Sequence, residues 1–325
     1  MRAISFDRFG GPDVLQLADM PEPAAAAGQI AIGVRYAGVN FAEVMARRGD
    51  WDISLPFVPG LEVAGTVLAA GTGVDPGLVG TTMVAFTGSG GYAEVAVADA
   101  ALAIPVGTDT ALPWPAAVAA ACMLPTAWGV LFGAGRLQAG ESVLVHAAAG
   151  GVGSIIGQLA REHGAGLVIG VVSTPEKAAY AAQFDCWDEL LLADDFRTEA
   201  AAVSPRRGFD VICDSVGGTA RLAGLGLLAP LGRLVVFGNA SASPEVSCGL
   251  QRLQETNRGA AGYNIADLAS RMPSVYRRHA MSALRLLEEG RLRLDITGVF
   301  PLEQAAMAHD LLESRRTTGK LTLKI

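Results

Sequence analysis

Alternating hydrophobic and polar positions run through the first third of the chain. In the segment QIAIGVRYAGV, Ile30, Ile32, Val34 and Tyr36 occupy every second position. The same alternation returns in LEVAGTVLAAG and YAEVAVA, and turn-forming sequences such as DPGLVG and TGSGG separate these runs. A period of two indicates strands with one buried face. Residues 1 to about 110 therefore predict an antiparallel β-domain, interrupted by one short helix in FAEVMARRG.

From about residue 113 the pattern changes to helices that alternate with strands. PWPAAVAAACMLPTAWGVLF reads as a long helical stretch, and the strand-like runs SVLVHA, GLVIGVV, FDVICD and GRLVVFG follow it with helical segments between them. This alternation predicts a doubly wound parallel sheet. After two more helices, the last run, KLTLKI, alternates like the strands of the first domain. We therefore expect a first domain over 1–119, with 265–325 returning to it, and a second over 120–264.

Length, composition and charge narrow the class of protein. A chain of 325 residues with 51% hydrophobic and 18% charged residues suits a globular protein of two domains. Gly, Pro and charged residues break every apolar run, and Asp7 and Arg8 lie where a secretory signal would be apolar. A net charge of -7 with scattered basic residues argues against a nucleic-acid partner. These features predict a soluble, cytoplasmic protein with no membrane partner.

Cysteine and histidine spacing gives no sign of a metal site. The chain has four cysteines without a CxxC pair, and none of its four histidines is spaced like a metal-binding pair on a helix face. We therefore expect buried free thiols and no bound metal.

The stretch VLVHAAAGGVGSIIGQLAREHGA, residues 143–165, joins a predicted buried strand to a helix through small residues. Gly150, Gly151 and Val152 fall at the start of the helix. A helix N-terminus has unpaired N–H groups and a partial positive charge, and glycine lets a pyrophosphate approach that backbone. The joint therefore predicts a dinucleotide site, although such glycines also serve tight packing of a helix on a strand.

The next strand, Leu167 to Val172, ends where a dinucleotide-binding domain reads the ribose of its ligand. An acidic residue there would bind a 2′-hydroxyl and repel a 2′-phosphate. Ser173 occupies that position instead, and Lys177 follows four residues later. A hydroxyl and a cation suit a phosphate, so NADPH is favoured over NADH. Alternatively, Lys177 is an exposed lysine in the first turn of a helix.

Several motifs together resemble the medium-chain dehydrogenase/reductase superfamily, and within it the zinc-independent quinone oxidoreductase group. The resemblance covers essentially the whole chain and implies a GroES-like β-domain, built from both chain ends, with a Rossmann domain. The motifs are VRYAGVNFAEVMARRGDW (34–51), LPFVPGLEVAGTVLAAGTGV (55–74), GGYAEVAV (90–97), MLPTAW (123–128), VLVHAAAGGVG (143–153), FDVICDSVGG (209–218), GRLVVFGNAS (232–241) and ESRRTTGKLTLKI (313–325).

Zinc-dependent relatives in this superfamily carry a cysteine near the position of Asn40 and a histidine directly before the glutamate at Glu62. This chain has neither residue, and Leu61 precedes Glu62. Because thiolate and imidazole ligands are what bind zinc tightly, the resemblance implies chemistry without a metal and a structural Glu62.

The resemblance also implies catalytic and cofactor-binding roles for Asn40 and Thr126. Asn40 could instead, or in addition, cap the helix that follows it, and Thr126 could bond within its own helix. Further cofactor-binding candidates are Gly150, Gly151, Val152, Ser173, Lys177, Phe237, Gly238, Asn239 and Arg315. Arg315 also fits a solvated arginine run.

The chain departs from the family pattern at three places. Glu43 replaces the usual Asp, Trp51 replaces a frequent Tyr, and Leu192 and Ala193 lie where a Tyr that assists the adenine phosphate is common. Trp51 can stack on a flat substrate but has no phenolic proton to donate. We keep Glu43 and Trp51 as substrate-pocket candidates.

The resulting expectation is an NADPH-dependent oxidoreductase that transfers hydride to quinones or related conjugated carbonyls. Reduction of the double bond of an enone, an alkenal or an enoyl thioester is an alternative with related chemistry. A non-catalytic NADPH-binding protein is an alternative of another class. The resemblance further implies a homodimer joined at a sheet edge, near Gly232 to Phe237 or in the segment after it.

Overall fold

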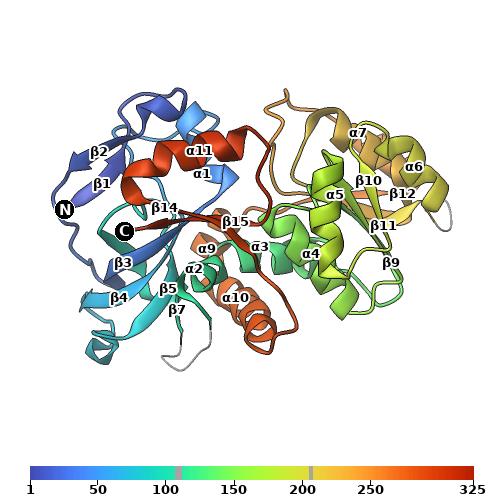
Figure 1. Cartoon of the computed structure of the whole chain (residues 1–325). Coiled ribbons are helices and arrows are strands. Elements are labelled where there is room, and N and C mark those ends of the chain that lie inside the picture. Colours follow the sequence, from blue (N-terminus) through green and yellow to red (C-terminus); the bar gives the residue numbers. More distant parts are fainter. Residues whose placement is uncertain (107–111, 205–207) are drawn as a thin grey trace. The chain divides into compact units, whose positions relative to one another are not determined.

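The computed structural model describes residues 1–106, 112–204 and 208–325. Contacts within the chain divide it into two compact units (Figure 1). The first unit comprises Met1–Pro125, Ile265–Glu289 and Leu294–Ile325, and the second comprises Thr126–Asn264 and Gly290–Arg293. The first unit is therefore assembled from both ends of the chain, and the second from its middle.

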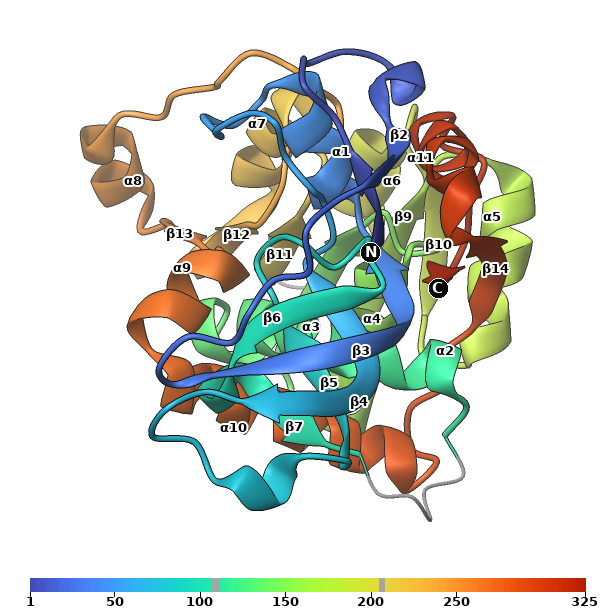
Figure 2. The same ribbon diagram turned by 90° about the vertical axis from the view of Figure 1, so that its left-hand side faces the viewer.

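The first unit contains a seven-stranded sheet and a two-stranded one. The larger sheet has the order β14-β15-β3-β4-β5-β7, and β6 also pairs with β3. Figure 2 shows β3, β4, β5 and β6 side by side. The strands are β1 (Arg2–Ser5), β2 (Gln16–Asp19), β3 (Gln29–Val39), β4 (Glu62–Ala70), β5 (Thr82–Phe86), β6 (Val95–Asp99), β7 (Ala103–Pro105), β14 (Ile296–Pro301) and β15 (Lys320–Lys324).

The last strand of the chain returns to the first unit, as the sequence pattern predicts. β15 runs antiparallel to β3, with Leu321 opposite Val39 and Lys324 opposite Tyr36. All pairs in the larger sheet are antiparallel except β14 with β15. Consecutive residues of β4, β5 and β15 are buried, so these strands are covered on both faces along part of their length.

The sequence pattern predicts that every second residue of β3 faces the core, and this prediction is correct only in the first half of the strand. Ile30, Ile32 and Val34 are buried, but Tyr36 is only half-buried, and Ala37 joins the core instead. The pairing of β3 with β4 shifts register between Val34 and Tyr36. Such a bulge inserts one residue, so the positions that face the core change from even to odd.

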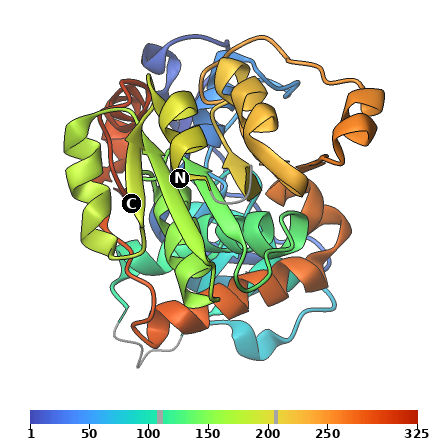
Figure 3. The ribbon, with the colours of Figure 1, turned by 90° about the vertical axis from the view of Figure 1, so that its right-hand side faces the viewer.

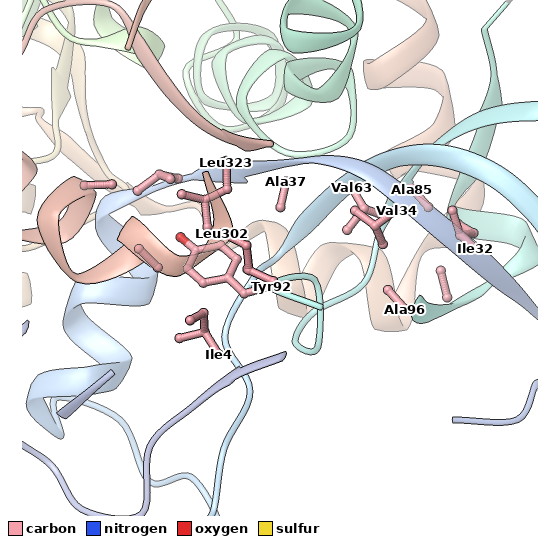
Figure 4. Packing of buried hydrophobic residues seen from close by; sticks show 14 of the residues in the cluster. Ile4, Ile32, Val34, Ala37, Val63, Ala85, Tyr92, Ala96, Leu302 and Leu323 are labelled. Atoms are coloured by element: carbon pink, nitrogen blue, oxygen red, sulfur yellow. The ribbon is translucent and has the colours of Figure 1, made fainter. Parts of the chain in front are cut away.

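The core of the first unit joins distant parts of the chain. Ile4, Val34 and Val63 pack in one cluster with Leu302 and Leu323 (Figure 4). The helices of this unit are α1 (Phe41–Arg48), α2 (Trp114–Ala117), α9 (Ile265–Arg271), α10 (Pro273–Glu288) and α11 (Ala305–Glu313). Both chain ends are therefore needed to complete one hydrophobic core.

The long helix expected near residues 113–132 is broken, contrary to the sequence-based expectation. α2 ends at Ala117, a 3-10 turn spans Val118–Ala120, and α3 (Met123–Trp128) begins after it and continues as a π-helical turn, Gly129–Ala134. Pro125 explains the new start, because proline lacks an N–H and fits only the first turn of a helix. Pro125 is the third residue of α3.

Among the described residues, no single helix is both long and apolar enough to cross a membrane. By length and composition only, the pair Trp114–Ala120 and Met123–Ala134, bent by 41°, passes that test together.

The second unit is a parallel sheet of six strands in the order β10-β9-β8-β11-β12-β13. Every neighbouring pair is parallel, which confirms the predicted doubly wound arrangement. Figure 3 shows the strands with helices around them. The elements are β8 (Ser142–His146), α4 (Gly151–Glu162), β9 (Leu167–Val172), α5 (Pro175–Ala181), β10 (Glu189–Leu192), α6 (Phe196–Val203), β11 (Phe209–Asp214), α7 (Gly218–Leu227), β12 (Leu228–Val236), α8 (Leu250–Thr256) and β13 (Gly259–Gly262).

Of the two places expected for a dimer contact, the segment after Phe237 lies at the edge of the six-stranded sheet, and Gly232 to Phe237 does not. β12 pairs with β11 on one side and with β13 on the other. β13 ends the strand order, so the edge belongs to the segment that follows β12.

Close packing of β4 on β3 requires a glycine at one position. A Cβ at Gly65 would lie 2.1 Å from the carbonyl oxygen of Gly33, whereas a Cβ at Gly33 would meet only the side chain of Leu68, at 3.2 Å. We expect Gly65→Ala to lower the free energy of unfolding by about 1–3 kcal/mol through overpacking. Gly33→Ala, the matched control, should cost less because the exposed Leu68 side chain can move. Denaturant unfolding measures both, and equal losses would contradict this account.

Candidate functional site

The glycine-rich joint between β8 and α4 has the predicted geometry. β8 is buried throughout, and α4 begins at Gly151 with Gly150 as its N-cap. The N–H of Gly150 donates to the carbonyl oxygen of Ala147 at 2.9 Å, and Ala147 adopts a positive φ of 54°. Gly150, Gly151 and Val152 thus form the entry to a helix of 12 residues. Its first N–H groups have no partner within the helix and carry partial positive charge.

Two glycines of this joint have different surroundings. A Cβ at Gly153 would lie 2.3 Å from the carbonyl oxygen of Ala147, so Gly153 serves the packing of the helix on the turn. A Cβ at Gly150 would contact only that oxygen, at 3.2 Å, and its φ of -82° suits any residue. The packing interpretation therefore applies to Gly153, whereas packing does not explain the glycine at position 150 to the same degree.

The loop after β9 lies at the same edge of the sheet as the glycine joint. β8 and β9 are parallel neighbours, so their carboxyl ends meet at one edge. Ser173 is exposed directly after β9, and Thr174 caps α5 by accepting the N–H of Lys177 at 3.3 Å. Ser173 and Lys177 are therefore brought beside the entry to α4.

The segment after β12 is held by a salt bridge that sequence reasoning missed. The buried Asp214 at the end of β11 accepts N–H groups from Val216 and Gly217, at 2.8 and 3.0 Å. Arg221 binds Asp214 at 2.7 Å and donates to the carbonyl oxygen of Gly238 at 2.6 Å. The signal in the sequence is an aspartate that ends a strand, with an arginine seven residues later.

Phe237, Gly238 and Asn239 are consequently fixed at the carboxyl end of the sheet. The N–H of Phe237 donates to the carbonyl oxygen of Asp214 at 3.0 Å, and the amide of Asn239 donates to the carbonyl oxygen of Ser243 at 2.9 Å. The second unit thus brings the Gly150 joint, the Ser173 loop and the Phe237 segment to one edge.

Asn40 lies in the first unit, between β3 and α1. It is the N-cap of α1, with extended φ and ψ of -122° and 158°, which confirms the capping alternative. Its backbone N–H donates to the Glu43 carboxyl group at 2.8 Å. Its side chain meets two further groups, Lys320 and Glu62, that the sequence analysis did not assign to it.

A buried polar network surrounds the Asn40 side chain. The ammonium group of Lys320 donates to Asn40 Oδ1 at 2.6 Å, to Glu62 Oε1 at 2.5 Å and to the carbonyl oxygen of Val39 at 3.1 Å. Asn40 Nδ2 donates to Glu62 Oε1 at 3.2 Å and to Glu43 Oε1 at 3.3 Å. The sequence signal that could have indicated Lys320 as a partner of Asn40 is a lysine at the first position of a buried strand, β15.

Glu43 and Glu62 are buried, and their carboxyl groups accept hydrogen bonds from the backbone of other segments. Glu43 is 2% exposed and accepts the N–H of Leu61 at 3.0 Å, and the fully buried Glu62 accepts the N–H of Cys122 at 2.8 Å. Burial raises the pKa of Glu43 to about 7, although the Lys320 charge and its hydrogen bonds oppose the rise. The structural role expected for Glu62 agrees with these contacts.

The remaining candidates are spread over both units. Trp51 is 40% exposed, and Arg315 is an exposed residue with a positive φ of 57° just after α11. Thr126 is half-buried in α3. Across the described ranges, no three His, Cys, Asp or Glu side chains are grouped as metal ligands would be.

The high pKa of Glu43 makes the stability of the fold depend on pH. Because the folded state binds this proton more tightly than the unfolded chain, its contribution is full below pH 4.5 and is lost as the pH rises through about 7. The loss amounts to about 3 kcal/mol. Glu43→Gln removes the titration, so the variant should gain stability relative to the unmodified protein between pH 5 and 8. Denaturant titrations at several pH values measure the free energy of unfolding of both proteins. An equal dependence on pH in the variant and the unmodified protein would contradict this assignment.

Comparison with known proteins places these features in a family. The family model of the alcohol dehydrogenase GroES-like domain matches residues 26–108, and that of the zinc-binding dehydrogenase matches residues 187–323. A quinone oxidoreductase of Pseudomonas aeruginosa is 34% identical, over 99% of both chains. The human synaptic vesicle membrane protein VAT-1 homolog is 31% identical, over 99% of this chain and 86% of its own.

Solved structures agree with the sequence matches. The mycobacterial protein Rv1454c, complexed with NADPH, is 32% identical with a TM-score of 0.92, and 100% of each chain is covered. The Escherichia coli quinone oxidoreductase, also complexed with NADPH, is 27% identical with a TM-score of 0.91, again over 100% of each chain.

A GroES-like domain and a parallel-sheet Rossmann domain in one chain define a medium-chain dehydrogenase/reductase. Within that superfamily, this chain belongs to the zinc-independent quinone oxidoreductase group. It is an oxidoreductase of that group.

Proposed function

We propose that this protein transfers a hydride from NADPH to quinones or related conjugated carbonyls without the help of a metal ion. The observation that carries the proposal is the grouping of Gly150, Ser173 and Lys177 at one edge of the parallel sheet. NADPH in the structures of two relatives supports the same coenzyme here.

The residues at this edge suit a phosphorylated dinucleotide. A Cβ at Gly150 would meet one atom, the carbonyl oxygen of Ala147 at 3.2 Å, and we infer that the absence of a side chain here leaves the backbone N–H groups of the helix N-terminus open to a pyrophosphate. Ser173 and Lys177 would bind the 2′-phosphate. The segment Phe237 to Asn239 would meet the nicotinamide. Asn40, Thr126 and Arg315 are further proposed cofactor-binding residues, the first two also catalytic.

When bound, NADPH supplies the hydride. Addition of hydride to a quinone or an enone leaves negative charge that is delocalised onto a carbonyl oxygen, so hydrogen-bond donors can stabilise it without a Lewis acid. Trp51, exposed and aromatic, is a proposed stacking surface for a flat acceptor.

A panel assay tests the proposal directly. Purified protein, NADPH and a series of quinones, enones, alkenals and enoyl thioesters are mixed, and the absorbance of the reduced nicotinamide is followed. We expect oxidation of NADPH with quinones. Turnover of enones or thioesters alone would favour double-bond reduction, and NADPH binding without any turnover would favour the non-catalytic alternative.

The 2′-phosphate assignment predicts a change in coenzyme preference. Lys177→Met should raise the Kd for NADPH by at least about 10-fold, because a charge-assisted hydrogen bond is lost, and leave the Kd for NADH unchanged. Lys324→Met removes an exposed lysine from β15 and serves as the control. Fluorescence titration measures each Kd. An equal effect of Lys177→Met on both coenzymes would contradict the assignment.

The two glycines of the joint should respond differently to alanine. Gly150→Ala should keep the thermal stability but raise the Kd for NADPH by about 10-fold, because its methyl group obstructs the helix entry. Gly153→Ala should lower the free energy of unfolding by about 1–3 kcal/mol through its clash with Ala147. If Gly150→Ala binds NADPH normally, the pyrophosphate lies elsewhere.

We further propose that the protein forms a homodimer through the edge of its six-stranded sheet at β13. Light scattering after gel filtration would give the mass of a dimer. Replacing Ala260 with proline, which cannot donate to a strand partner, should favour the monomer if β13 is the interface.

A further inference from the structure

Two loops of the second unit are joined by backbone hydrogen bonds at the carboxyl edge of its sheet. One loop follows β11, and the other follows β12. The N–H of Ala240 donates to the carbonyl oxygen of Ser215 at 2.9 Å. The N–H of Ser241 donates to the carbonyl oxygen of Val216, also at 2.9 Å. The second unit by itself therefore determines the path of the segment after β12.

Glycines let the two loops lie directly against each other. A Cβ at Gly238 would lie 3.0 Å from the carbonyl oxygen of Ser215, and a Cβ at Gly218 would lie 2.5 Å from the hydroxyl oxygen of Ser243. Gly218 also has a positive φ of 58°, which favours glycine. Backbone contact between the loops is therefore as close as their hydrogen bonds require.

Arg221 connects the end of β11 to the segment after β12. Its Nε donates to the buried carboxyl group of Asp214 at 2.7 Å, and its Nη2 donates to the carbonyl oxygen of Gly238 at 2.6 Å. Burial lowers the pKa of His146, which lies near Asp214, so this imidazole is uncharged at neutral pH. Arg221 therefore supplies the positive charge at Asp214, and its rigid planar group determines where Gly238 lies.

These contacts reduce the entropy that the segment can lose on binding. The N–H of Phe237 and the carbonyl oxygen of Gly238 both bond to groups of the second unit. Ordering a loop when a ligand binds costs free energy, and a loop that its own fold already holds does not incur that cost again. The segment is thus built to receive a ligand without rearranging.

We propose that Arg221, paired with Asp214, is a positioning residue that holds the segment 237–239 in its binding conformation before the coenzyme arrives. The inference rests on the proposed function, in which this segment meets the nicotinamide. It implies that Arg221 contributes to the affinity for the nicotinamide half of NADPH. The adenosine half, assigned to the glycine joint and the loop after β9, should not depend on Arg221.

Two ligands separate the halves of the coenzyme. NADPH carries both halves, and adenosine 2′,5′-bisphosphate carries only the adenosine with its 2′-phosphate. Asp214→Asn combined with Arg221→Met removes the ion pair without leaving a lone buried charge. We expect this paired variant to raise the Kd for NADPH by about 10-fold and to keep the Kd for the bisphosphate within about twofold of its original value. Titration calorimetry measures both constants.

A matched control lies toward the amino end of the same sheet. Arg233 forms a salt bridge with Glu141, the residue directly before β8, and donates to the carbonyl oxygen of Gly135. Its side chain is 14% exposed, against 15% for Arg221. Arg233→Met combined with Glu141→Gln should lower the melting temperature but change neither Kd.

The outcomes distinguish the possible failures. An unchanged Kd for NADPH in the paired variant of Asp214 and Arg221 would overturn the positioning role. Equal weakening of both ligands would overturn it too, because it indicates a general loss of structure in the second unit. If the unmodified protein binds neither ligand, the proposed function fails, and this inference fails with it.

Hydrogen exchange gives a second measurement if the paired variant does not fold. Arg221→Lys keeps a charge beside Asp214 but lacks the second arm of the guanidinium group. Without coenzyme, the N–H groups of Ala240 and Ser241 should exchange slowly in the unmodified protein and at least about 10-fold faster in Arg221→Lys. Saturating NADPH should slow them again in the variant. Rapid exchange in the unmodified protein before NADPH is added would refute a segment held in advance.

Discussion

The buried ion pair between Lys320 and Glu62 connects the two ends of the first unit. Lys320 opens the last strand of the chain, and Glu62 opens β4, 258 positions earlier. Around this pair, β15 joins β3, and Asn40 caps α1 at the end of the same strand. Two charges in a protein interior are stabilising only when every donor and acceptor has a partner. This requirement explains why so many backbone and side-chain groups converge there.

The second unit depends on a different principle. Its candidate site is formed mainly by backbone groups at the carboxyl edge of parallel strands, where helix entries and loops collect. One buried salt bridge, Asp214 with Arg221, ties the segment after β12 to the end of β11. The two units therefore differ in how they are held together: the second relies on backbone groups and one salt bridge at its sheet edge, and the first on a buried network of side chains around Lys320.

Sequence reasoning succeeded where one local pattern determines one element. The run SVLVHA, the glycine joint and the strand Leu167 to Val172 all form the predicted elements, because strand and helix periods differ clearly there. It failed where a single residue interrupts the pattern. A bulge near Tyr36 reversed the faces of β3, and Pro125 restarted a helix that looked continuous.

The sequence by itself determined the alternation of elements, the two-part organisation of the chain and the glycine joint, because these depend on neighbours along the chain. Only the tertiary structure decided the environment of Asn40. Glu43 lies three residues from it, but Glu62 and Lys320 are 22 and 280 positions away, and no periodic pattern links them. A buried charge needs its partner in space, and folding alone brings that partner to it.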